Sequence, residues 1–274
     1  MAIITFWNNK SGHIGQSFST ITTALNMAIE HNYKILVIST KMDDTVIERA
    51  FGVSESIAAK VLGIKESKMD SGIQGLKKLA YSNKLTPEII KNYTKIIFKN
   101  RLEVIGGDRV EIESEFAQYP VIIKNANKAY DMVFVDLTNG FDKQYQKDII
   151  EASDVLVWNL EQQYDEINKI IKFKEKNHII DENKIIYLFN KYEKNSKYNI
   201  KNIVRNSKIK KYLYAIPYDY MLSDVIQDGK LANWILTPQI RNSKPLDAHG
   251  ELIDETKKLC EGIIVKLKEQ HIMK

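Results

Sequence analysis

Residues 3–7 read IITFW, residues 8–17 read NNKSGHIGQS, and residues 18–31 continue with apolar side chains at helical spacing. The first segment predicts a buried strand, the second a polar loop with two glycines, and the third an amphipathic helix. The first N–H groups of a helix have no intrahelical partner, and the helix dipole favours an anion beside them. The stretch is therefore a candidate phosphate-binding loop.

The loop departs from the full phosphate-binding motif, which reads G-x-x-x-x-G-K-[ST]. Lys10 stands at the position of the first glycine, and Gly15-Gln16-Ser17 replaces Gly-Lys-Ser. The glycines still allow the backbone to approach a phosphate closely, but the lysine charge is missing. Taken alone, the same residues also suit a strand, an ordinary glycine turn and a helix.

Composition limits the class of protein. The chain has 274 residues, of which 44% are hydrophobic, and we expect a single domain over 1–274 because no linker interrupts it. No apolar run approaches the ~20 residues of a membrane-spanning helix, and no signal peptide is expected. The single cysteine, Cys260, excludes an intrachain disulfide and fits a reducing cytoplasm. The net charge of +5 permits weak attraction to DNA or anionic lipid.

Strands and helices alternate along the chain, which predicts an α/β fold: a doubly wound, mostly parallel sheet with helices on both faces. Beyond residues 2–7, strands are expected at 34–39, 101–107, 130–136, 154–158, 184–189 and 212–217. Helices are expected at 18–31, 113–127 with a break at Pro120, 143–152, 165–174, 200–205, 221–228 and 252–267. Residues 45–100 are predicted to form a helical elaboration, with helices at 55–62, at 72–79 and from Pro87 to Phe98.

Two polar residues follow buried strands. Asp136 ends the clearest strand of the chain, and Asn190 follows the strand at 184–189. Alone, each residue is typical of a turn or a cap. Behind a candidate phosphate-binding loop, Asp136 becomes a candidate metal ligand and Asn190 a candidate nucleotide contact.

The order of these features is specific. The loop and its helix come first and are followed by the polar segment at 40–44. After a long interval the chain continues with Asp131-x4-Asp136, residues 152–157, Asn190 and Ile216-Pro217. This order resembles the ParA/MinD superfamily of deviant Walker-A ATPases, and most of all its divergent CpaE/TadZ-like branch. The resemblance spans nearly the whole chain and implies the P-loop NTPase fold. The family's loop, K-G-G-x-G-K-T-T, aligns with residues 11–18 without a gap.

This alignment implies a set of nucleotide-binding positions: Lys10, Ser11, Gly12, His13, Ile14, Gly15, Gln16, Ser17, Phe18 and Asn190. Ser17 and Asp136 would hold Mg²⁺, and Asn190 would contact the adenine edge. Gln16 replaces the P-loop lysine and Ser11 the lysine that crosses the family's dimer interface, with Lys10 as the candidate substitute. Ser39 and Lys41 occupy the family's Asp-x-Asp positions, with Asp43 and Asp44 nearby.

The resemblance implies ATP or ADP with Mg²⁺ as cofactors and a homodimer. It also implies a cytoplasmic position, free or peripheral at the inner face of the membrane, beside the protein components of a pilus, secretion or conjugation machine. Phosphoryl transfer depends on charge placed at the developing anion. The loss of the lysine therefore predicts a protein that binds nucleotide and hydrolyses it slowly or not at all.

Two other functions remain open. One is an active plasmid or chromosome partition ATPase that binds DNA without sequence preference through basic residues: Arg205, Lys208, Lys210 and Lys211. The other is an interaction module with a dead site. The last predicted helix resembles the membrane-targeting helix of MinD, although its apolar stripe favours packing on the sheet. Its lysines are Lys257, Lys258, Lys266 and Lys268.

Overall fold

The computed structural model describes residues 1–10, 12, 14–41, 46–53, 72–107, 113–163, 165–205, 209, 211–237, 240 and 248–273. Among these residues, eight strands form one sheet in the order β3-β4-β2-β5-β1-β6-β7-β8. Their bounds are β1 (Ala2–Trp7), β2 (Ile35–Ser39), β3 (Lys95–Phe98), β4 (Leu102–Ile105), β5 (Met132–Asp136), β6 (Val155–Leu160), β7 (Ile185–Tyr192) and β8 (Leu213–Pro217). Neighbouring strands are parallel except β3, which pairs antiparallel with β4 at the edge.

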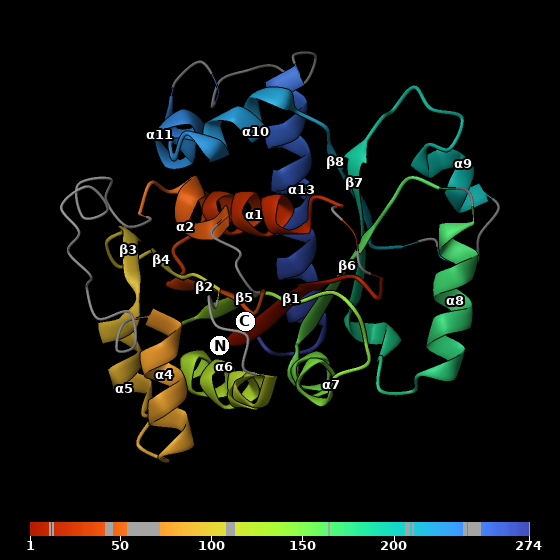
Figure 1. Ribbon diagram of the computed structural model, residues 1–274. Helices are drawn as coiled ribbons and strands as arrows, with labels where there is room; N and C mark the ends of the chain where they lie inside the picture. Colours follow the sequence, from red (N-terminus) through yellow and green to blue (C-terminus); the bar gives the residue numbers. More distant parts are fainter. Residues whose placement is uncertain are drawn as a thin grey trace.

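Helices cover both faces of this sheet (Figure 1). One face carries α1 (Gln16–Glu30), α2 (Val46–Ala50), α10 (Tyr220–Gln227), α11 (Leu231–Leu236) and α13 (Ala248–Glu269). The other carries α4 (Gly72–Tyr81), α5 (Pro87–Ile90), α6 (Tyr119–Asn127), α7 (Gln144–Ala152), α8 (Glu166–Lys176) and α9 (Ile200–Arg205). Three short 3₁₀ segments complete the described elements: η1 (Lys91–Tyr93), η2 (Glu113–Gln118) and η3 (Glu182–Lys184). The predicted α/β fold class is confirmed.

The central strands are apolar because both of their faces are covered. Every residue of β1, β2, β5 and β6 is buried, as expected for a parallel sheet between two helical layers. The predicted strands and most of the predicted helices are found within a few residues of their expected ends.

The prediction for residues 45–100 was partly wrong. The helix that starts at Pro87 ends with η1, and Lys95–Phe98 is the edge strand β3. A tight turn joins β3 to β4, with Asn100 at φ 61° and the Arg101 N–H donating to the Phe98 carbonyl. The β-branched residues of this segment therefore pair with β4 instead of continuing a helix. The helix α11 was not predicted, and the predicted helix at 55–62 lies outside the described residues.

Helix α1 is buried on two sides, between the sheet and α13 (Figure 1). Its polar residues are buried with their side chains bonded to carbonyls one turn earlier: Ser19, Thr20, Thr22, Thr23 and Asn26. Such bonds satisfy hydroxyl and amide groups inside a helix. On the α13 side, the buried Cys260 Sγ lies 3.5 Å from the Thr23 carbonyl oxygen, and burial raises the pKa of the Cys260 thiol.

Helix α13 packs on the sheet, as its apolar stripe favours. Leu252, Leu259, Ile263 and Leu267 are buried in the core that α13 shares with α1. Three of its four lysines interact within the protein: the Lys257 ammonium lies 3.3 Å from Glu30, and Lys258 pairs with Asp254 and Glu255. The Lys266 ammonium lies 3.7 Å from the centre of the Tyr212 ring. Within the described residues, no helix is long and apolar enough to cross a membrane.

Gly262 of α13 sits against the ring of Tyr214 in β8, where an added methyl group would overlap the ring. Gly262→Ala is therefore expected to lower the free energy of unfolding by about 1–3 kcal/mol, although alanine in an open helix would raise it by up to ~1 kcal/mol. Urea denaturation measures the change. In a Tyr214→Ala background the same substitution should be neutral or stabilising, and an equal loss in both backgrounds would contradict the steric explanation.

Candidate functional site

The strand order of the sheet reverses direction at the neighbouring strands β1 and β5. The connection from β1 runs through α1 to β2, and the connection from β5 runs through α7 to β6, on the other side of β1. The helices α1 and α7 lie on opposite faces of the sheet (Figure 1). Ligands of doubly wound sheets bind at such a reversal of strand order. The described residues of the loop (8–10, 12, 14 and 15) and Asp136 lie at this edge.

Gly15 begins α1 in the left-handed conformation, with φ 83°. A side chain is strained in this conformation, and a Cβ atom at Gly15 would lie 3.6 Å from the Cβ atom of Asn190. No described side chain caps the amino end of α1, and its first turn contains no acidic residue. The end of the helix therefore keeps the positive potential and the N–H groups that attract a phosphate.

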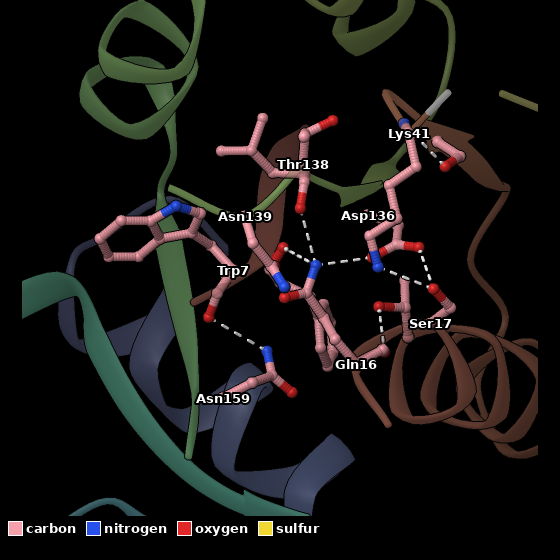
Figure 2. A network of polar contacts seen from close by, with 12 residues as sticks. Trp7, Gln16, Ser17, Lys41, Asp136, Thr138, Asn139 and Asn159 are labelled. Atoms are coloured by element: carbon pink, nitrogen blue, oxygen red, sulfur yellow. Dashed lines mark hydrogen bonds and ion pairs between the residues drawn. The ribbon is translucent and has the colours of Figure 1, made fainter. Parts of the chain in front are cut away.

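Gln16 points beneath the loop, into the edge of the sheet (Figure 2). Its Nε2 atom lies 2.7 Å from Asp136 Oδ1, 3.0 Å from the Phe6 carbonyl and 2.8 Å from the Leu137 carbonyl. The side-chain amide thus offers two N–H groups to three acceptors. The residue at the lysine position consequently supports the ends of β1 and β5 and contributes no cation.

Lys41 brings a cation to this cluster from the end of β2. Its Nζ atom lies 2.9 Å from Asp136 Oδ1 and 2.8 Å from Ser17 Oγ. The Ser17 hydroxyl in turn donates to Asp136 Oδ2 at 2.6 Å. Asp136 is fully buried, and the Lys41 side chain is 19% exposed. A hydroxyl and an ammonium group thus both satisfy one buried carboxylate (Figure 2).

The ends of β2 and β5 are also joined by backbone and threonine contacts. The Thr40 N–H donates to the Asp136 carbonyl at 3.0 Å. The Thr138 N–H donates to Thr40 Oγ1 at 2.8 Å, and the Thr138 hydroxyl donates to the Thr40 carbonyl at 2.7 Å. The position of Lys41, one residue beyond Thr40, is therefore fixed relative to Asp136.

The arrangement does not fit a magnesium ion. Ser17 and Asp136, the two predicted ligands, do lie together, but the Lys41 ammonium contacts both of them. Mg²⁺ requires near-octahedral oxygen ligands at ~2.1 Å, and here it would meet a like charge at that place. Among the described residues, no group of three histidine, cysteine or acidic side chains is placed to hold a metal.

Lys10, the candidate substitute for the lysine that crosses the dimer interface, contacts a carboxylate of its own chain. Its Nζ atom lies 3.0 Å from each carboxylate oxygen of Glu166, the first residue of α8. Glu166 is buried, whereas about half of the Lys10 side chain is exposed. Lys10 therefore joins the loop to α8 and does not join Ser17 and Asp136.

Asn190 lies beside the loop within a buried amide network. Its Nδ2 atom donates to Asn159 Oδ1 at 2.7 Å, and the Ser19 hydroxyl donates to the same oxygen at 3.1 Å. Asn190 Oδ1 is buried and has no hydrogen-bond partner among the described residues. Asn190 is thus near Gly15, and among the described residues its Oδ1 acceptor has no partner. Its predicted contact with the adenine edge stays a prediction. Asn159 was not predicted, because nothing in its local sequence distinguishes it from a strand residue.

The remaining predicted residues divide into two groups. Gly12 is exposed, with its carbonyl 3.3 Å from Asn139 Nδ2, while Ile14 is buried and Phe18 is half-buried against the core. Ser11, His13, Asp43 and Asp44 lie outside the described residues, as do Lys208 and Lys210 of the basic cluster.

Solved structures share this fold at low sequence identity. A ParA family ATPase from Chlorobium tepidum is 13% identical with a TM-score of 0.68, over 97% of this chain and 98% of that chain. The cell division ATPase MinD of Pyrococcus furiosus is 15% identical with a TM-score of 0.67, over 96% and 98%. A plasmid partition protein from Borrelia burgdorferi, solved with AMPPNP, is 17% identical with a TM-score of 0.61, over 98% and 99%. Neither a protein-family model nor a curated protein matches the sequence.

Replacing Gln16 tests its supporting role. Gln16→Met keeps the length of the side chain but leaves Asp136 and two carbonyls with fewer donors. It is expected to lower the free energy of unfolding by about 1–3 kcal/mol in urea denaturation. The matched control is Gln144→Met, since Gln144 is exposed and its side-chain amide donates to the exposed side chain of Asp148. The control should stay within about 0.5 kcal/mol of wild type, and equal effects would contradict the role of Gln16.

Proposed function

We propose that the chain binds ATP or ADP at the loop of residues 8–17 and hydrolyses ATP slowly or not at all. The observation that carries this proposal is Gly15, whose left-handed conformation sets the uncapped end of α1 at the carboxyl edge of the sheet. Support comes from shared folds: the Borrelia partition protein was solved with AMPPNP, and a MinD from Pyrococcus horikoshii with Mg-ADP.

Slow hydrolysis follows from the charges at the site. Phosphoryl transfer needs cations placed on the transferred group. Gln16 is neutral and bonded beneath the loop, while Lys41 is paired with Asp136. The loss of one such stabilising group typically lowers the rate on the order of 10²–10³. Binding depends instead on backbone N–H groups and the helix dipole, which this chain keeps.

We further propose a ParA-like localising role of the CpaE/TadZ type. The protein would form a homodimer and organise protein components of a pilus, secretion or conjugation machine at the inner face of the membrane. The nucleotide site would comprise the predicted residues from Lys10 to Phe18 with Asn190. The structure of MinD from Aquifex aeolicus in complex with MinC, at 13% identity to this chain, illustrates a partner complex formed by this fold.

The second candidate is an active partition ATPase, favoured by the likeness to the Borrelia partition protein. Exposed Arg205 and Lys211 would then contact DNA phosphates. The two functions differ in a simple measurement, because DNA should stimulate ATP turnover by a partition ATPase and leave a localising scaffold unaffected. Salt-sensitive DNA binding would also favour partition.

Gly15→Val tests nucleotide binding at the loop. A β-branched residue at φ 83° strains the backbone and fills the space beside Asn190. ATP affinity measured by isothermal titration should fall at least about tenfold, a loss of ~1.4 kcal/mol. Gly72→Val is the matched control, because Gly72 also has a positive φ, of 59°, but lies at the start of α4. Apart from its chain neighbours and its own helix backbone, no described residue has an atom within 4 Å of a Cβ added there.

The control should lose stability and keep ATP affinity. Equal affinities of the two variants would place the nucleotide elsewhere. If neither ATP nor ADP binds to the wild-type chain, the protein is an interaction module and the proposed function fails.

A further inference from the structure

Lys41 lies just beyond the carboxyl end of β2, next to the end of β5. β2 pairs with β5 so that Ser39 lies opposite Asp136, and Lys41 follows two residues later. The Lys41 side chain turns back over the ends of the two strands and contacts Asp136 and Ser17 (Figure 2). At this place the resemblance leads one to expect an acidic residue that positions the attacking water and senses the nucleotide, and the chain has a cation.

The ammonium group has the chemistry of a substitute for a metal ion. It is positively charged and donates three hydrogen bonds. Two of its contacts are the Ser17 hydroxyl and the Asp136 carboxylate, which are the two groups expected to hold Mg²⁺. The Ser17 hydroxyl accepts from Lys41 while it donates to Asp136. The carboxylate charge is thereby balanced inside the site without a divalent ion.

We propose that Lys41 takes the place of the magnesium ion, and that this chain binds nucleotide without a divalent metal. The inference rests on the proposed function, since it concerns how the same site neutralises phosphate. Bound phosphate oxygens would lie over the Lys41 ammonium group, which is 19% exposed and anchored from below by Asp136.

The same lysine could instead replace the P-loop lysine and leave the metal in place, but the contacts favour the metal position. The side chain of Gln16 already occupies the position of the P-loop lysine, with Nε2 2.7 Å from Asp136. The contact that distinguishes the two roles is the one to the Ser17 hydroxyl, at 2.8 Å, because that hydroxyl is the metal ligand of a P-loop.

Isothermal titration of ATP into the full chain, once in excess EDTA and once in excess Mg²⁺, tests the inference. The wild-type protein should bind ATP with dissociation constants within about twofold of each other in the two buffers. Lys41→Ser removes the ammonium and opens its space, so ATP should bind at least about tenfold more weakly in EDTA and recover in Mg²⁺. Lys41→Met fills the space without charge and should bind weakly in both buffers.

Lys34→Ser is the matched control. Lys34 lies just before β2, at the opposite end of the same strand, where its ammonium is 3.8 Å from Glu103 and its side chain is 24% exposed. This variant should keep the wild-type affinity and the wild-type insensitivity to EDTA. A loss equal to that of Lys41→Ser would show that any lysine lost beside β2 weakens binding, and would overturn the inference.

The outcomes separate the two proposals. If wild-type protein binds ATP only when Mg²⁺ is present, the metal substitution is wrong and the nucleotide site stands. If no nucleotide binds in either buffer, the proposed function fails. Electron paramagnetic resonance of added Mn²⁺ then still tests Lys41, because Lys41→Ser should bind Mn²⁺ more tightly than wild type. Equal Mn²⁺ binding by the two proteins would overturn the inference.

Discussion

The buried carboxylate of Asp136 governs the carboxyl edge of this sheet. An ionised group without water is tolerated only when charge and hydrogen bonds surround it. Here three partners come from two different elements: Gln16 and Ser17 from the first turn of α1, and Lys41 from just beyond the end of β2. Satisfying one charge therefore fixes the loop, the helix and two strands relative to one another. The contacts of Asp136 with Gln16, Ser17 and Lys41 therefore help to position the loop, together with its glycines.

Much of the fold could be predicted from sequence, because buried parallel strands leave continuous apolar runs such as residues 132–135 ending in Asp136. The edge strand β3 could not be predicted, since its segment reads as the end of a helix until β4 is available to pair with it. At the site, the loop and Asp136 were found by their motifs. The inward turn of Gln16 depends on the register between β1 and β5, and the reach of Lys41 on the register between β2 and β5. Local sequence encodes neither register.

A shared architecture at 13% to 17% identity leaves the chemistry open, because function resides in sites placed on folds. Two side chains distinguish this edge from a phosphate-binding loop with its lysine and metal: neutral Gln16 beneath the loop and cationic Lys41 beside it. Compared with such a loop, the lysine charge is missing from the first turn of α1, and a lysine charge is present beyond the end of β2. Rapid phosphoryl transfer depends on cations placed at the transferred group, and for this reason we propose that the chain binds nucleotide and hydrolyses it slowly or not at all.

The packing of α13 on α1 has a practical consequence. Cys260 is the single thiol of the chain and is enclosed between these helices, with its pKa raised by burial. A thiol-directed reagent needs access to the sulfur and the thiolate form. The native packing buries the sulfur and, by raising its pKa, disfavours the thiolate. The rate at which Cys260 is labelled therefore reports how often the two helices separate. The measurement needs no engineered cysteine.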